Sequence, residues 1–132
     1  MSVEGKQLCW VGLGGATGAI GRALLSHVPG LPPEIAVLMV NVAGCALIGL
    51  VLHIEHRFHP HVRDFQAAGF CGGLTTVSSW SLLVVKYLEM GELVQAGFFA
   101  ALSLVSGLLA LLLGRAVAVG IEALLLRRGQ PE

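Results

Sequence analysis

Charge is scarce in this sequence. Asp, Glu, Lys and Arg make up 12% of its 132 residues. The hydrophobic residues Ala, Val, Ile, Leu, Met, Phe, Trp, Tyr and Cys make up 55%. A soluble domain carries about 25% charged residues, so eight basic and eight acidic side chains are too few to cover a water-exposed globule. The zero net charge also excludes a basic surface for nucleic acid. Lipid is the solvent that fits this composition.

Cysteine is scarce too, and acids are missing from the middle of every apolar run. Cys9, Cys45 and Cys71 are single and far apart, which excludes a disulfide framework and a zinc motif. The first apolar run contains Arg22 and no small-residue cleavage site, so we expect no cleaved signal peptide. Without a mid-membrane carboxylate there is no group to attract a cation or relay a proton.

Four long apolar runs remain, each able to cross a membrane as a helix of about 20 residues. We predict spans at about 8–27, 34–53, 65–87 and 93–118, all in one transmembrane domain covering 1–132. Helices are the expected spanning elements because lipid leaves every backbone group to bond within the protein. The sequence therefore predicts an all-α, multi-pass protein of the cell membrane.

The basic residues predict an orientation. An even number of spans places both termini on one side, together with six basic residues against two, Arg22 and Lys86, on the other. The six are Lys6, Arg57, Arg63, Arg115, Arg127 and Arg128. By the positive-inside rule, this bias favours cytoplasmic termini.

Glycine is abundant, with 18 residues, and two of them form the pair Gly14-x-x-x-Gly18. Small residues at this spacing let helix backbones approach closely in lipid. We expect an oligomer, because four thin helices make a poor channel alone. Packing of the pair within the chain is the open alternative.

Polar residues inside the apolar runs are the functional candidates, since lipid makes them costly. Asn41 lies mid-way in the second run, where an amide without partners would cost about 1–3 kcal/mol, so we expect it to face the third or fourth helix or a polar pathway. Hydroxyl residues follow Gly72-Gly73 in the third run. The fourth run places Phe99, Ser103 and Ser106 on one helical face. Neutral donors with an arginine near the mouth suit a small anion. For a single serine, a hydrogen bond to its own helix is the simpler explanation.

Gly72-Gly73 has two interpretations that the residues leave about even. Two glycines weaken a helix by about 2 kcal/mol relative to alanine, so the helix could break there and expose carbonyl oxygens suited to a cation. Alternatively, the pair marks a close helix crossing with no break.

Three segments together resemble the Fluc/CrcB fluoride channel family. Gly14-Gly-Ala-Thr-Gly-Ala-Ile-Gly-Arg22 resembles its first-helix pattern G-G-x-x-G-A-x-x-R, and Val40-Asn-Val-Ala-Gly44 resembles V-N-x-x-G of its second. Gly69-Phe-Cys-Gly-Gly-Leu-Thr-Thr-Val-Ser-Ser-Trp-Ser81 is similar to the third-helix signature G-F-x-G-G-x-T-T-F-S-T-F-S. The motifs occur in the family's order and spacing over nearly the whole chain.

The resemblance implies an antiparallel, dual-topology dimer of four-helix subunits with a broken third helix and two fluoride pathways. It implies a structural Na⁺ at the dimer centre, held by the backbone carbonyls of Gly72 and Thr75 from both subunits. It further implies passive export that lowers cytoplasmic fluoride, and no enzymatic activity. The residues expected along the pathway are Arg22 at the vestibule and, further in, Asn41, Thr76, Val77, Ser78, Trp80, Phe99 and Ser103.

This sequence departs from the family pattern at the aromatic positions. The signature has two phenylalanines whose ring edges, positive by quadrupole, contact the anion; here they are Val77 and Trp80. Trp80 keeps a ring edge and adds an indole N–H donor, whereas Val77 offers neither. Leu83 replaces a glutamate that is common in the family shortly after the signature. Phe99 stands where the family often has a tyrosine, so the hydroxyl is absent here.

Other functions fit less well. A small multidrug transporter of four helices needs an embedded carboxylate, where this first helix offers Arg22. A membrane enzyme would rely on metal binding by His53, His56, His59 and His61, a stretch more typical of a solvated loop. A non-conducting partner subunit of a heteromeric fluoride channel is the third alternative, favoured by Val77 and by the biased basic residues.

Overall fold

The computed structural model describes residues 3–54 and 59–128, and its regular elements are helices. The first two spans are α1 (Val3–Ser26) and α2 (Pro33–Ile54), and the last is α6 (Leu93–Arg128). The third span covers Pro60–Glu89 in several parts. All four are long and apolar enough to cross a membrane. The predicted all-α membrane protein with four spans is confirmed.

The third span is irregular along its length. It begins as α3 (Pro60–Arg63), widens into the π-helix η2 (Asp64–Cys71), and returns to α-helix in α4 (Gly72–Leu74). The helix then stops: Thr75 has ψ 155° and Thr76 has φ −147°, both extended, before α5 (Val77–Glu89) begins. The predicted break is present, but it lies at Thr75–Thr76. Gly72 itself keeps helical angles of φ −65° and ψ −36°.

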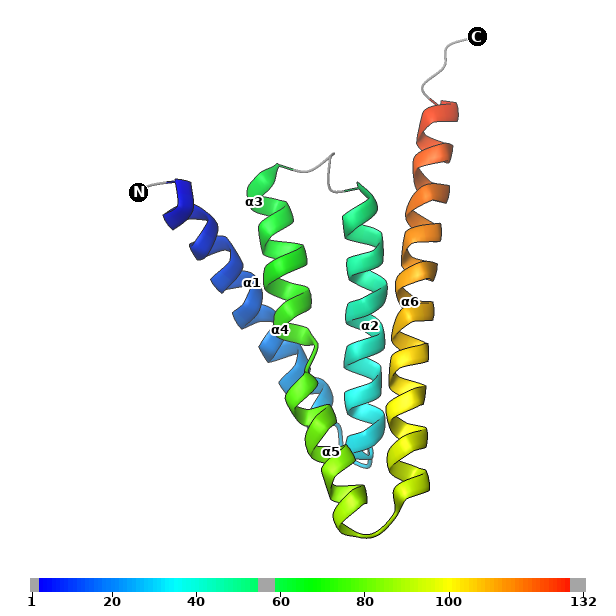
Figure 1. Cartoon of the computed structure of the whole chain (residues 1–132). Helices are drawn as coiled ribbons and strands as arrows, with labels where there is room; N and C mark the ends of the chain where they lie inside the picture. Colours follow the sequence, from blue (N-terminus) through cyan, green and yellow to red (C-terminus); the bar gives the residue numbers. More distant parts are fainter. Residues whose placement is uncertain (1–2, 55–58, 129–132) are drawn as a thin grey trace.

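Two pairs of packed elements organise the chain (Figure 1). The helix α2 lies along α6, and α1 crosses η2 and α4. After the break, α5 descends to a short turn and joins the start of α6. The beginnings of α1 and α3 and the ends of α2 and α6 share the upper end of Figure 1, where His53 Nε2 lies 3.0 Å from Glu122 Oε2. The lower end carries the turn between α5 and α6.

Glycines make the close crossings. A Cβ on Gly18 would collide with the carbonyl oxygen of Phe70, and one on Gly73 would collide with that of Gly15. The Gly14–Gly18 pair therefore packs α1 on the third span within one chain, the alternative that the sequence left open. Gly73 is likewise at a close crossing, and the break follows two residues later, so both interpretations of the double glycine apply.

The buried core is small and made of small side chains. Val40 is the largest fully buried side chain, and most other buried positions are alanine, valine or glycine on α2 and α6. Large apolar side chains face outward instead, among them Val77 at 76% exposure and Leu104 at 70%. In water such a surface would aggregate. It fits a chain surrounded by lipid or by another apolar subunit.

Candidate functional site

Asn41 on α2 holds the break in the third span. Its amide Nδ2 donates to the carbonyl oxygen of Thr76 at 3.1 Å, and its Oδ1 accepts from the Thr76 N–H at 2.8 Å. The amide thus gives the Thr76 N–H the partner that the interrupted helix no longer supplies. It also adds a second bond to the Thr76 carbonyl, which as the N-cap carbonyl accepts the first bond of α5. The sequence predicted that this amide faces the third or fourth helix or a polar pathway, and it bonds the backbone of the third span. Both ends of the amide are engaged there, which makes Asn41 a brace for the break.

Arg22 on α1 reaches the same place. Its Nη1 donates to the carbonyl oxygen of Thr75 at 3.1 Å. A hydrogen bond from a charged group is among the stronger ones available to a freed carbonyl. The expected vestibule arginine therefore lies beside the break, where it brings a positive charge to the two extended residues. Asn41 and Arg22 together bond the backbone of both.

A group of hydroxyls follows at the start of α5. Thr76 caps the helix: its Oγ1 accepts from the N–H of Ser79 at 3.2 Å. The same Oγ1 lies 3.2 Å from Ser78 Oγ and donates to Ser79 Oγ at 3.2 Å. Thr76 is buried, with 6% exposure. An N-cap threonine explains locally why the chain re-enters a helix directly after the break.

A cavity of about 430 Å³ opens beside this break. It is bounded by Asn41, Thr75, Thr76, Val77, Trp80 and Ser103, with leucines of α6 completing the wall. Six positions predicted to matter for the pathway or the cation are thus brought together from α2, the break, α5 and α6. None of the described residues lining it is acidic. The lining offers hydroxyl and amide groups among apolar side chains, a surface suited to a small neutral or anionic species.

Two of these positions differ in how they face the cavity. Trp80 lines the cavity with its side chain, while its Nε1 atom is buried and has no hydrogen-bond acceptor among the described residues. An unbonded buried donor costs about 1–3 kcal/mol, so this N–H favours an acceptor coming from outside the chain. Val77 is 76% exposed and supplies only an apolar methyl surface at the cavity rim.

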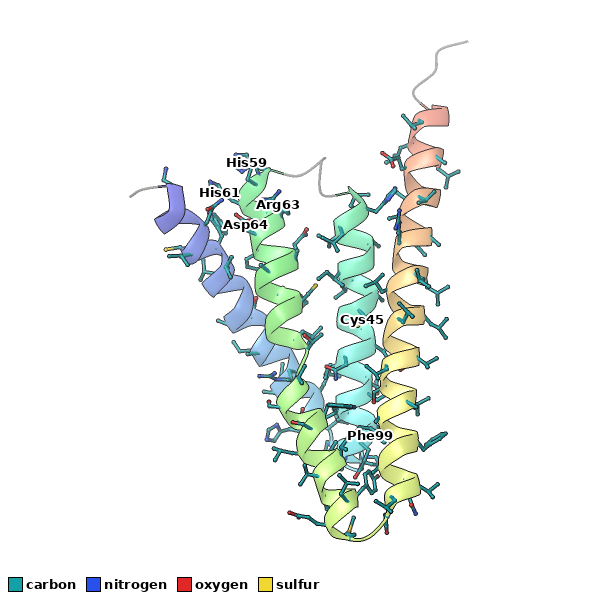
Figure 2. The ribbon with its side chains drawn as sticks, viewed as in Figure 1. Cys45, His59, His61, Arg63, Asp64 and Phe99 are labelled. Atoms are coloured by element: carbon teal, nitrogen blue, oxygen red, sulfur yellow. The ribbon has the colours of Figure 1, made fainter. Side chains whose placement is uncertain are left out.

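The residues on α6 play a mixed part. Ser103 Oγ donates to the Phe99 carbonyl oxygen at 2.7 Å, the bond to its own helix that a single serine favours. Its oxygen therefore borders the cavity with its proton already engaged. Phe99 is buried, at 7% exposure, and its ring lies 6.2 Å from that of Tyr87 near the lower end of the molecule (Figure 2). Phe99 and Ser78 do not line the cavity.

The carbonyls expected to hold sodium are compatible with a hard cation. Gly72 is exposed, and a Cβ there would meet nothing within 4 Å, so this part of α4 faces away from its own chain. The Thr75 carbonyl accepts from Arg22 with one lone pair and keeps a second. Neutral carbonyl oxygens are suitable ligands for such an ion. One chain offers only these two, so a second subunit would have to complete the set.

The histidines do not gather into a metal centre in the described residues, where no group of three or more His, Cys, Asp or Glu could hold an ion. His53 pairs with Glu122, while His59 and His61 lie with Arg63 and Asp64 at the start of the third span (Figure 2). The ring of His61 stacks on Trp10 at 5.9 Å. His56 lies outside the described residues.

A second cavity lies at the lower end, among residues that were not predicted site positions. About 330 Å³ in volume, it is lined by Ser26 of α1, the start of α2, and Ser79, Leu83 and Lys86 of α5. The spacing of Ser79, Leu83 and Lys86 is that of one helical face, a signal that was available in the sequence. What the sequence did not show is that α1 and α2 close this face into a cavity.

Comparison with known proteins identifies the family. Residues 9–115 match the family described as CrcB-like protein, Camphor Resistance (CrcB). The chain belongs to the CrcB family. Among its relatives are proteins named fluoride-specific ion channel FluC in Ruegeria pomeroyi, 40% identical over 83% of this chain and 88% of the relative, and in Salinibacter ruber, 40% identical over 95% and 94%. The FluC of Prosthecochloris aestuarii is 41% identical over 82% and 89%.

Membership agrees with the geometry of the site. The match to the CrcB family spans every site element, from Arg22 on α1 to Ser103 on α6. CrcB proteins are channels and not enzymes, as the sequence predicted. The chain is a multi-pass membrane protein of this family.

Proposed function

We propose that this chain is a subunit of a fluoride channel that lets fluoride leave the cell passively. The cavity beside the break is the observation that carries the proposal. It brings Trp80, Thr76 and Asn41 to one place in a membrane span, with no acidic side chain among its described lining residues and with Arg22 bonded to the Thr75 carbonyl close by. Donors without carboxylates stabilise an anion that has lost its water.

Passive conduction follows from the lack of a coupling group. A proton-coupled carrier needs an ionisable side chain in the membrane that binds and releases protons with each cycle. Among the described residues lining the cavity there is no carboxylate, histidine or lysine, and the one titratable group is the thiol of Cys45. Fluoride would therefore move down its own gradient.

The functional unit we propose is an antiparallel dimer. Val77 and Leu104 border the cavity and are 76% and 70% exposed, so one chain leaves its pathway open on that side. A second subunit seated there would close it and bury the apolar rim. Both the dimer and its dual topology come from the family resemblance and from this open wall.

We also propose a structural Na⁺ at the dimer centre, held by the carbonyls of Gly72 and Thr75 from each subunit. The outward-facing position of Gly72 supports it. Such an ion would fix the two broken helices against each other. The chain itself supplies Asn41 and Arg22, which keep the extended residues in place.

Fluoride efflux from liposomes tests the proposal directly. Vesicles containing the purified protein and loaded with fluoride should release it when a potassium ionophore balances charge, whereas protein-free vesicles should not. Replacing fluoride by chloride is the selectivity control, and a Thr76→Val variant should conduct less, because it removes the central hydroxyl while keeping the side chain's shape. Wild-type vesicles that retain fluoride would contradict the proposed function.

A further inference from the structure

A second cavity lies at the lower end of Figure 1, where α1 ends, α2 begins and α5 descends. Lys86 and Ser79 line it on α5 and Ser26 lines it on α1. We propose that this cavity is the entrance through which a hydrated anion reaches the break, with Lys86 as the attracting charge and Ser79 as the first donor. The inference rests on the proposed channel function and assigns a site and residues beyond it.

Ser79 connects the two cavities. It lines the lower one, and its Oγ accepts a hydrogen bond from Thr76 Oγ1 at 3.2 Å. Thr76 in turn lines the cavity at the break. Because Thr76 supplies the proton of that bond, the proton of Ser79 is available to an acceptor in the lower cavity. A pair of hydrogen-bonded hydroxyls therefore joins the lining of one cavity to the lining of the other.

Lys86 is the positively charged side chain that lines the proposed entrance. It is exposed on the same face of α5 as Ser79, two turns further along. Arg22, the basic residue of α1 at this level, is bonded to the Thr75 carbonyl above. Carboxylates surround the same end of the molecule: Glu34 begins α2, and Glu89 and Glu92 flank the turn after α5. Among the described residues that line the cavity itself, Lys86 is the one charged side chain, and it offsets part of that negative charge where an anion would enter.

Charge at the mouth of a site acts on the rate of arrival. Steering by fixed charges changes association rates by about 10- to 1000-fold, and salt screens it over a Debye length of about 8 Å at physiological ionic strength. A role for Lys86 in attraction therefore predicts a specific pattern. Its removal should slow flux at low fluoride and low ionic strength, and the difference should vanish in high salt and at saturating fluoride.

The chain offers a matched control, because Lys6 and Lys86 are its two lysines. Lys6 is exposed near the start of α1, at the opposite end of the molecule. We would measure initial fluoride efflux from neutral-lipid liposomes for wild type, Lys86→Met and Lys6→Met across a range of an impermeant salt. Lys86→Met should fall about 10-fold at low salt and converge with wild type at high salt, while Lys6→Met should match wild type throughout.

Further variants separate the outcomes. Lys86→Arg keeps the charge and should conduct like wild type, whereas Ser79→Ala should conduct less at every salt concentration because it removes the donor. If wild type conducts and Lys86→Met equals it at all salt concentrations, the entrance is wrong and the channel stands. A wild type that does not conduct removes the proposed function itself. A Lys86→Met defect confined to vesicles with anionic lipid would mean that Lys86 binds a headgroup phosphate, which also overturns the entrance.

Discussion

At the scale of single residues, the site depends on backbone groups that side chains hold in place. Thr75 and Thr76 leave the helix, and their freed polar groups would be costly in lipid. Arg22 bonds one carbonyl, and Asn41 bonds the N–H and the carbonyl of the next residue. The polar residues that were candidates for touching the anion thus include two that build the surface around it.

Replacing Asn41 by Asp and by Ala should reduce fluoride flux in both variants. Alanine leaves the Thr76 N–H without a partner, which costs about 1–3 kcal/mol, and removes one bond to the Thr76 carbonyl, so the break shifts. Aspartate can still accept from the Thr76 N–H but cannot donate to its carbonyl while ionised, and it adds a negative charge beside the cavity. Efflux from liposomes and thermal unfolding in detergent measure the two effects. Flux in Asn41→Ala equal to wild type would show that the brace is dispensable.

The roles of these residues were only partly readable from the sequence. A buried amide in a lipid span requires partners, which sufficed to place Asn41 against the third or fourth helix. The partner of Arg22 could not be foreseen, because its long side chain reaches Thr75 only through the crossing of α1 over α4. The sequence also could not decide whether the Ser103 hydroxyl donates to its own helix or to the pathway, because that depends on the side-chain rotamer. In the structure it donates to the Phe99 carbonyl oxygen.

At the scale of helices, glycine sets how closely the spans approach. On α1, Gly14 and Gly18 meet the backbone of the third span directly, and Gly73 meets that of Gly15. On the other side of the molecule, Gly49 and Gly114 bring α2 and α6 together in the same way. In lipid the hydrophobic effect does not drive apolar helices together, so van der Waals contact between closely approaching backbones stabilises their packing.

A methyl group at these crossings should therefore destabilise the chain. Gly18→Ala and Gly73→Ala each place a Cβ against backbone atoms that cannot move aside, and overpacking of this kind costs about 1–3 kcal/mol. The control is Gly12→Ala, also on α1, where an added Cβ meets nothing within 4 Å. Thermal unfolding in detergent should show a lower midpoint than wild type for Gly18→Ala and Gly73→Ala. The midpoint of Gly12→Ala should be unchanged. Equal midpoints in all three would contradict the crossing.

The sequence predicted the elements more firmly than their details. Length and apolarity fix four spans, and a double glycine before hydroxyl residues indicates an interruption. The position of the break was predicted at Gly72–Thr75 and lies at Thr75–Thr76, because Asn41 on another helix captures the Thr76 N–H. The π-helical stretch of η2 had no signal in the residues. The last helix continues past the span predicted at 93–118 to Arg128, as expected for a tail in which no proline follows before residue 131.

At the scale of the whole molecule, the proposed sodium ion makes a separate prediction. If carbonyls of Gly72 and Thr75 from two subunits hold Na⁺, exhaustive exchange of sodium for a bulky organic cation should reduce fluoride flux, and returning sodium should restore it. The gradient of fluoride and the ionic strength are kept constant so that only the cation changes. Lithium and potassium, of different size, serve as controls for selectivity. Full flux after sodium exchange would contradict the site.

The orientation of the chain in the membrane is the remaining question at this scale. An antiparallel homodimer requires one sequence to insert both ways, yet six basic residues fall on the terminal side against two on the other. Much of that excess is distal: Arg127 and Arg128 end α6, which extends beyond the other helices at the upper end of Figure 1. Charges far from the membrane weigh less in setting topology.

We therefore expect this chain to insert in both orientations. A cysteine-free version with a single reporter cysteine after residue 132 can be labelled from outside intact cells and again after permeabilisation. Removing Cys9, Cys45 and Cys71 leaves the reporter as the sole thiol, and efflux from liposomes shows that the chain still conducts. Comparable labelling on both faces, with flux intact, means that one sequence forms the whole channel. Labelling on one face alone, together with flux that appears only when an oppositely inserted relative is co-expressed, would mean that the open wall beside Val77 is closed by a different chain.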